Sequence, residues 1–225
     1  MFENIPERYE LINHVLTMGL DIFWRRNVAR CAARSGGTKW LDICTGTGET
    51  AIYLHRAATK NTSIYAVDFT ESMVREFKRK RDANCIRILV GEAALLPFPD
   101  HYFNMIIISF ASRNLNITQD HFLQCLREFY RVLKPGGRFI NLETSRTNNH
   151  LIRRLYHLYI HLVVAPVGRL ISSEPTSYQY LSQSMRRFYD ADTLEQLIRK
   201  AGFDHVTYRQ MMFGATAVHK AIKTS

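Results

Sequence analysis

Between Lys39 and Glu143, short apolar runs alternate with segments of helical pattern, and no other feature constrains the fold as strongly. The apolar runs are nearly continuous, as in strands that are buried on both faces of a parallel sheet. They cover residues 39–44, 62–68, 86–90, 102–110 and 138–143. Helices are predicted between them at 45–55, 70–81 and 119–133, the last ended by Pro135-Gly136-Gly137. The alternation predicts an α/β fold with a doubly wound, mostly parallel sheet.

The rest of the chain extends this core at both ends. Two helices precede it, at 7–17 and 20–34. After it come helical patterns at 148–165 and 190–201 and two final strands, at 203–209 and 211–223, the last antiparallel. The 225 residues, 46% hydrophobic and 22% charged, suit a single domain. Its predicted parts are an N-terminal helical cover (1–38), a core (39–145), a helical insertion (146–189) and a final helix with two strands (190–225).

The composition of the chain limits the cell compartments and the binding partners that we expect. No apolar run approaches the ~18–20 residues of a membrane-spanning helix, and the first ten residues lack the pattern of a secretory signal. The four cysteines are scattered without a C-x-x-C motif, so we expect neither a disulfide framework nor a zinc knuckle, and a cytoplasmic protein. The net charge of +10, part of it at 78–81, suits nucleic acid, an anionic membrane or anionic small molecules, or simply solvated helix faces.

In an open parallel sheet, ligands bind beyond the carboxyl ends of the strands, so the residues there form the candidate site. The first strand carries Asp42 and leads into a loop with Gly46, Thr47 and Gly48. Its glycines allow close approach of a ligand, and the next helix offers unpaired N–H groups. The loop matches neither the full dinucleotide motif nor a P-loop. Asp68 ends the second strand, where its carboxylate can accept from ribose hydroxyls or, alternatively, cap the next helix.

The third and fourth strands also end in polar groups. After the third strand, Glu92 can accept from an exocyclic amine while the N–H of Ala93 donates to a ring nitrogen, a pair that reads adenine. The alternative is a surface loop with a solvated glutamate. The fourth strand ends in S-F-A-S-R-N, which brings Ser109, Arg113 and Asn114 to the same edge.

Four stretches together resemble the class I S-adenosylmethionine-dependent methyltransferases: L-D-I-C-T-G-T-G-E-T-A, A-V-D-F-T-E-S-M, G-E-A-x-x-L-P-F-P-D and R-V-L-K-P-G-G-R-F. Residues 9–24 and 131–145 further resemble the two signatures of the C-methyltransferases of menaquinone and ubiquinone biosynthesis, the UbiE/MenG group. The resemblance extends from residue 2 to about residue 220. It implies a class I methyltransferase fold with a Rossmann-like sheet, in which residues 1–38 fold over the site as a lid and 146–189 contact the substrate.

The resemblance also implies the cofactor, S-adenosyl-L-methionine, and its contacts. The predicted cofactor-binding residues are Asp42, Gly46, Thr47, Gly48, Asp68, Phe69, Glu92, Ala93 and Ser109. Three positions depart from the family pattern: Asp21 stands where a histidine is usual, Glu92 replaces Asn or Asp, and Ala111 replaces a glycine. The first departure bears on any proton transfer at position 21, and the second bears on the adenine contact.

In the family that it resembles, a methyl group is transferred to a ring carbon of a reduced polyprenyl quinone, either demethylmenaquinol or a benzoquinol. That carbon becomes nucleophilic when a neighbouring hydroxyl loses its proton, so the site needs a base, a water or a cation, but no metal. Arg113 can stabilise the phenolate or merely pair with Glu143, which is itself a candidate base. Asn114 can bond a quinol oxygen, and Tyr9 of the lid can orient the quinol or simply pack.

Several alternatives stay open. An RNA methyltransferase fits the +10 charge, but the Asn/Asp-Pro-Pro-Tyr/Phe tetrad is absent after the fourth strand, so no nucleic acid partner is expected. A non-catalytic scaffold is disfavoured by the glycine loop and Asp68. His157 and His161 lack the carboxylate of H-E-x-x-H, which favours packing over metal binding. The aromatic stretch 151–168 suits a core, a groove for the prenyl tail or peripheral contact with an anionic membrane. The sequence is also compatible with a homo-oligomer.

Overall fold

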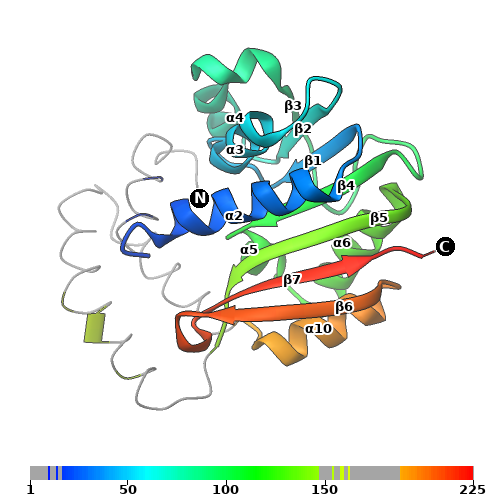
Figure 1. Ribbon diagram of the computed structural model, residues 1–225. Helices are drawn as coiled ribbons and strands as arrows, with labels where there is room; N and C mark the ends of the chain where they lie inside the picture. Colours follow the sequence, from blue (N-terminus) through cyan, green and yellow to red (C-terminus); the bar gives the residue numbers. More distant parts are fainter. Residues whose placement is uncertain are drawn as a thin grey trace.

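The computed structural model describes residues 10, 14, 17–146, 154, 158, 159, 162 and 188–224. Its strands are β1 (Lys39–Ile43), β2 (Ser63–Asp68), β3 (Arg87–Val90), β4 (Phe103–Ser109), β5 (Leu133–Thr144), β6 (Asp204–Met211) and β7 (Thr216–Ile222). They form one sheet in the order β3-β2-β1-β4-β5-β7-β6 (Figure 1). The pairs from β3 to β5 are parallel, and β7 is antiparallel to both of its neighbours. The predicted mostly parallel sheet with an antiparallel final strand is confirmed.

Helices cover both faces of this sheet (Figure 1). One face packs against α2 (Leu20–Ser35), α3 (Glu49–Ala57) and α4 (Glu71–Lys78), and the other against α6 (Gln119–Val132) and α10 (Ala191–Lys200). Three short elements complete the described chain: α5 (Ser112–Leu115) and the 3-10 turns η1 (Arg81–Cys85) and η3 (Met212–Gly214). The result is a three-layer α/β/α arrangement.

The isoleucine run of β4 shows why the strands are apolar at every position. Met105 and Ile107 pack in the cluster that includes α2, whereas Ile106 and Ile108 pack in the cluster that includes α6. All four side chains are at most 1% exposed. Because successive side chains of a strand point to opposite faces, a sheet covered on both sides needs apolar residues at each position. Burial of one such side chain contributes about 1.5–3 kcal/mol.

The strand order reverses direction at β1, which pairs with β2 on one side and with β4 on the other. The connections after β1 and β4 therefore leave the sheet toward opposite sides. In doubly wound sheets this reversal opens a crevice at the carboxyl ends of the strands, where ligands bind. The fold thus selects the ends of β1, β2 and β4 as the place for a functional site.

Three predicted element bounds are wrong. The helix predicted at 70–81 ends at Lys78, because Arg79 is already its C-cap residue and the backbone of Lys80 is extended. Pro135-Gly136-Gly137 does not follow the helix as a stop: α6 has already ended at Val132, and these residues lie within β5. The register of β5 with β4 shifts there, between the Phe103 and Met105 pairs.

The strand predicted at 211–223 is also wrong at its start. Met211 ends β6, and residues 212–214 form the turn η3. Met212 and Phe213 have φ angles of 47° and 55°, which lie in the left-handed region that strands do not use. The apolar sequence of this turn hid it among strand residues.

Several predicted features lie outside the described residues. They are Tyr9, most of the helix at 7–17 and most of the stretch 148–168, with His157 and His161. The roles proposed for these features, and the division into lid, core and insertion, stay predictions.

Candidate active site

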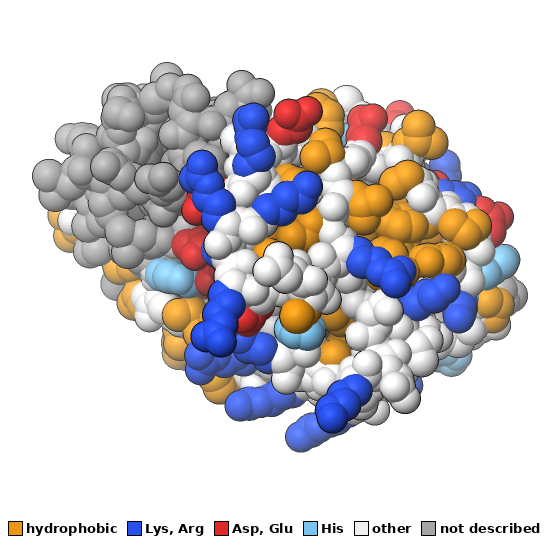
Figure 2. Space-filling model, turned by 90° about the horizontal axis from the view of Figure 1, so that it is seen from above, with side chains coloured by type: hydrophobic (Ala, Val, Ile, Leu, Met, Phe, Trp, Pro, Cys, Tyr) orange, Lys and Arg blue, Asp and Glu red, His pale blue; other side chains and the backbone are white. Residues whose placement is uncertain are grey.

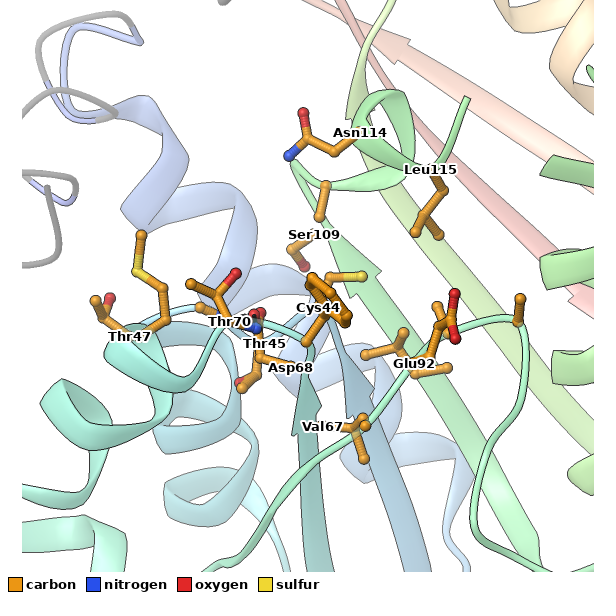
Figure 3. A pocket seen from close by; sticks show the side chains of 18 of the residues that line it. Cys44, Thr45, Thr47, Val67, Asp68, Thr70, Glu92, Ser109, Asn114 and Leu115 are labelled. Atoms are coloured by element: carbon orange, nitrogen blue, oxygen red, sulfur yellow. Dashed lines mark hydrogen bonds between the residues drawn. The ribbon is translucent and has the colours of Figure 1, made fainter. Parts of the chain in front are cut away.

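A cavity of about 320 Å³ opens where the fold predicts it, at the carboxyl ends of β1, β2 and β4 (Figure 3). Segments far apart in sequence contribute to its wall: the loop after β1, the loop after β2, the loop after β3 and the segment after β4. The predicted site residues that line it are Gly46, Thr47, Asp68, Phe69, Glu92, Ala93, Ser109 and Asn114. Asp42, Gly48 and Arg113 do not line it.

Gly48 has a packing role. Its φ of 84° lies in the region that favours glycine, and a Cβ atom there would lie 2.2 Å from the ring of Phe77. Gly48 precedes the first residue of α3, so its missing side chain lets that helix begin directly against α4. The glycine therefore shapes the loop by its packing, and its predicted contact with the cofactor stays a prediction.

Asp42 also acts from beneath the loop. The carboxyl group is 1% exposed, and its Oδ2 accepts a hydrogen bond of 2.6 Å from Thr45 Oγ1. Burial raises its pKa to about 7, against the hydrogen bond from Thr45 and the charge of Arg25, which lower it. Asp42 holds the first turn of the glycine loop, and its predicted contact with the cofactor stays a prediction.

Asp68 ties two loops together at the cavity wall. Its Oδ2 accepts from the N–H of Gly46 at 2.7 Å, and its Oδ1 accepts from the N–H of Thr70 at 2.9 Å. Burial raises the pKa of this carboxyl group, while the two backbone N–H donors lower it. Each carboxylate oxygen has a second lone pair, so Asp68 can still accept hydrogen bonds from a ligand. The alternative of a helix cap is partly met as well, because Thr70 is the N-cap residue of α4.

The loops after β2 and β3 supply a further part of the cavity wall. Phe69 is 74% exposed although it lines the cavity, so its ring is available to cover a flat ligand. Glu92 and Ala93 line the wall next to β3, and a short bridge between Glu92 and Leu95 fixes the turn there. These positions fit the predicted recognition of an adenine.

Ser109 ends β4 in the middle of the cavity wall, and Asn114 follows in α5 (Figure 3). The hydroxyl of Ser109 is buried and has no hydrogen-bond partner among the described residues. A buried hydroxyl without a partner costs roughly 1–3 kcal/mol. This orphaned group that faces a cavity is a mark of a ligand-binding position.

Arg113 adopts the alternative that the sequence left open. Its Nη1 donates to Glu143 Oε1 at 2.6 Å, and its backbone N–H donates to Glu143 Oε2 at 3.3 Å. The two side chains are only 4% and 1% exposed. The ion pair joins the end of β4 to the end of β5 and orients the segment that carries Asn114. Stabilisation of a phenolate by Arg113 stays a prediction.

A cluster of charged residues on the far side of the glycine loop was not predicted. Arg25 of α2 and Glu49 of α3 both line the cavity, with Arg25 Nε 3.8 Å from Glu49 Oε2. His14 and Asp21 contact each other behind them, at 2.9 Å. Asp21 and Arg25 are one turn apart on α2, and Glu49 follows the glycine loop directly. The spacing of Asp21 and Arg25 could have been recognised in the sequence. The contact between Arg25 and Glu49 could not, because the two residues are 24 positions apart and lie on different helices.

Two further cavity contacts were missed. Thr47 Oγ1 donates to a carboxylate oxygen of Glu10, which also binds Lys80 Nζ. His121, expected only as part of a helix body, lines the cavity at the start of α6.

The fold is that of the class I methyltransferases, and solved structures agree with it. A methyltransferase of Thermotoga maritima superposes with a TM-score of 0.68 at 20% identity, over 99% of this chain and 97% of that one. A second, from Aquifex aeolicus, gives a TM-score of 0.63 at 20% identity over 91% and 92%. Both proteins are described as dependent on S-adenosylmethionine (SAM).

The chain belongs to the ubiE/COQ5 methyltransferase family, whose model matches residues 1–223. Its curated relatives include the ubiquinone/menaquinone biosynthesis C-methyltransferases UbiE of Dinoroseobacter shibae and Azotobacter vinelandii. They are 35% and 34% identical to this chain. The match covers 99% of this chain and 89% and 88% of the two relatives. The predicted family is therefore confirmed.

Membership of this family makes S-adenosyl-L-methionine the cofactor, and the cavity fits it. The carboxylate of Asp68 at the end of β2 suits a ribose, and the exposed ring of Phe69 suits an adenine. The hydroxyl of Ser109, which has no partner among the described residues, suits a polar group of the cofactor. The oppositely charged side chains of Arg25 and Glu49 complete the polar end of the cavity. None of the described helices is both long and apolar enough to cross a membrane.

Proposed function

We propose that this protein transfers a methyl group from S-adenosylmethionine to a ring carbon of a reduced polyprenyl quinone, a demethylmenaquinol or its benzoquinol counterpart. The observation that carries the proposal is the match to the family along residues 1–223, combined with a cavity that offers cofactor groups and an apolar wall together. The cofactor contributes an electrophilic methyl group bound to a sulfonium. The protein must then position a ring carbon in line with it.

The wall formed after β4 suits the ring. Ala111 and Leu115 line the cavity with apolar surface, and the amide of Asn114 lies between them in sequence. An amide can donate to or accept from a quinol oxygen, so it can orient the ring in either protonation state. We assign this wall to the substrate, and we assign Thr47, Asp68, Phe69, Glu92, Ala93 and Ser109 to the cofactor.

The proposal is tested by methyl transfer from labelled S-adenosylmethionine to reduced demethylmenaquinone and to its benzoquinol counterpart, with bulk RNA as a third acceptor. We expect label in the quinol fraction and none in RNA. The oxidised quinones are the matched control, because a quinone has no hydroxyl to ionise and its ring carbon is not nucleophilic. Label in RNA alone would contradict the proposed substrate class.

We further propose that the cavity mouth contacts an anionic membrane, where a polyprenyl substrate resides. Phe69 and Ile117 line the cavity and are 74% and 77% exposed, which places apolar surface at its rim. Phe69 lies just before α4, whose end begins the basic run 78–81. Figure 2 shows Lys and Arg side chains as the prevailing charged groups on the face seen from above. Each cation near an anionic surface contributes about 1 kcal/mol.

Cosedimentation with vesicles tests this contact. We expect binding to vesicles that contain phosphatidylglycerol, weaker binding at high salt, and no binding to neutral phosphatidylcholine vesicles. Equal recovery with both vesicle types would contradict an electrostatic contact.

A further inference from the structure

Asp21 is a fully buried carboxylate at the first turn of α2, and its neighbours hold it in one orientation. Its Oδ1 accepts from Thr17 Oγ1 at 2.7 Å, and its Oδ2 lies 2.9 Å from His14 Nδ1. A carboxylate on one ring nitrogen fixes the histidine tautomer and stabilises the imidazolium form. The side chain of His14 is 27% exposed, so a proton that it takes up can pass to water.

The other ring nitrogen of His14 faces a second carboxylate. Nε2 lies 3.5 Å from Oε1 of Glu49, which lines the cavity directly after the glycine loop. Burial raises the pKa of Glu49, Arg25 lowers it, and the charges of Glu10, His14 and Asp21 act more weakly. Glu10 is itself paired with a lysine. A carboxylate that retains a proton more readily than usual is a suitable acceptor near neutral pH.

His14, Asp21 and Glu49 also have the donor atoms of a metal site, within 4.8 Å of one another. A fixed cation already occupies the position between the two carboxylates, because Arg25 Nε lies 3.7 Å from Asp21 and 3.8 Å from Glu49. The guanidinium is anchored by a 2.6 Å hydrogen bond to Thr50 and lies over the ring of Phe110. The cluster therefore suits proton transfer better than a second cation.

We propose that Glu49, His14 and Asp21 form the proton-accepting chain of the active site, with Glu49 as the catalytic residue that takes the hydroxyl proton of the substrate. His14 receives the proton from Glu49, and Asp21 is a positioning residue. The inference rests on the proposed function, because it requires a substrate with an ionisable ring hydroxyl.

The proposed reaction conserves protons and electron pairs. The O–H bond of the quinol breaks, its electron pair stays on oxygen, and the proton passes to Glu49 and then to His14. The ring carbon forms a bond to the methyl group while the methyl–sulfur bond breaks, and that electron pair goes to sulfur. Glu49, again ionised, accepts the proton of the same ring carbon and returns one to the oxygen. One proton is released per methyl group.

The test combines turnover with calorimetric titration of S-adenosylmethionine. For Glu49→Gln we expect kcat to fall about 10²–10³-fold, while cofactor affinity changes less than about threefold. Formate should restore part of the activity of Glu49→Ala, and imidazole part of that of His14→Ala. Glu76→Gln is the matched control, because Glu76 pairs with Arg79 on α4 outside the cavity, and it should behave as wild type.

The split between kcat and KM tests the positioning role of Asp21. For Asp21→Asn we expect kcat to fall while KM and cofactor affinity stay near wild type, and Asp21→Glu should recover part of kcat. Wild-type kcat in Asp21→Asn would overturn the positioning role of Asp21.

Two other results would overturn the assignment of Glu49 as the proton acceptor. Wild-type turnover in Glu49→Gln, with an active wild-type enzyme, would refute the inference alone. A loss of cofactor affinity that accounts for the whole loss of activity would make Glu49 a cofactor ligand instead. A wild-type enzyme that methylates no quinol would refute the proposed function, and the acceptor with it.

Discussion

The two sides of the cavity use their polar groups in opposite ways. On the glycine-loop side, Asp42 and Asp68 bind groups of the adjacent loops, such as Thr45 Oγ1 and the N–H groups of Gly46 and Thr70. On the side of β4, β5 and α2, charges bind one another across the fold. Arg113 pairs with Glu143 across 30 residues, and Arg25 lies between Asp21 and Glu49.

The difference separates two tasks. Carboxylates that organise backbone leave lone pairs directed at a ligand and require no conformational change when it binds. Charges that satisfy one another are stable without a ligand and leave few groups for the substrate, of which Asn114 and Glu49 face the cavity. We therefore expect changes on the first side to alter cofactor affinity, and changes on the second to alter stability or turnover.

The largest effect is expected from Glu143→Gln, which removes the charge that Arg113 faces. Removal of one charge from a buried ion pair should lower the free energy of unfolding by about 3–5 kcal/mol. Urea denaturation measures this loss. The control is Glu195→Gln in the exposed pair with Arg199, which should cost less than about 1 kcal/mol. Equal losses in the two variants would contradict a buried structural pair.

The next effect is the pH dependence caused by Asp42. The folded protein keeps this proton up to about pH 7, whereas the unfolded chain releases it near the ordinary value of 3.8. The folded state thus loses stability as pH rises between these values, by an amount on the order of 2–4 kcal/mol. Asp42→Asn should lack this loss, so its stability advantage over wild type grows from pH 5 to pH 8 in urea denaturation.

A matched control for Asp42→Asn is Asp100→Asn. Asp100 is an exposed residue whose pKa is lowered by its hydrogen bond with Arg131. Its variant should not gain stability relative to wild type as the pH rises. Parallel curves for wild type and Asp42→Asn would show that Asp42 is not protonated in the folded protein.

A smaller effect is expected for Asp68→Ala, which removes the carboxylate that binds the N–H groups of Gly46 and Thr70 on the cofactor side. Loss of hydrogen bonds to a charged acceptor should weaken S-adenosylmethionine binding by about 2–3 kcal/mol, or roughly 30- to 150-fold. Titration calorimetry measures it, with circular dichroism to verify the fold and Asp100→Ala as the exposed control. Unchanged affinity would remove the ribose assignment.

The smallest effect is expected for Ser109→Ala, which removes the orphaned hydroxyl. The unliganded protein should gain about 1 kcal/mol in thermal unfolding, because a desolvated group without a partner is lost. Cofactor affinity should fall by about the same amount, roughly fivefold. A destabilised unliganded variant would mean that the hydroxyl has a partner within the protein.

The sequence predicted what depends on local pattern. Apolar runs predicted the strands from β1 to β5, and strand ends with known roles predicted Asp68, Glu92 and Ser109 at the cavity. It could not decide between two partners for Arg113, because the pair with Glu143 requires the register of β4 against β5. The packing role of Gly48 could not be predicted either, because only the folded chain brings Phe77 against it.

The charged cluster was missed for the same physical reason. Asp21 appeared only as a departure from the family pattern, yet in three dimensions it contacts His14, which supplies an imidazole seven residues earlier. Its partners come from α2, α3 and the segment before α2, and local sequence pattern does not report which helix faces meet.

The central claim, transfer of the methyl group to a ring carbon, is tested most directly by carbon NMR of the product. Methyl-labelled S-adenosylmethionine and reduced demethylmenaquinone are incubated with the protein, and the labelled product is extracted. We predict a single new resonance with the chemical shift of a methyl group on an aromatic carbon. A methoxyl resonance would instead mean transfer to a quinol oxygen, and it would contradict the account.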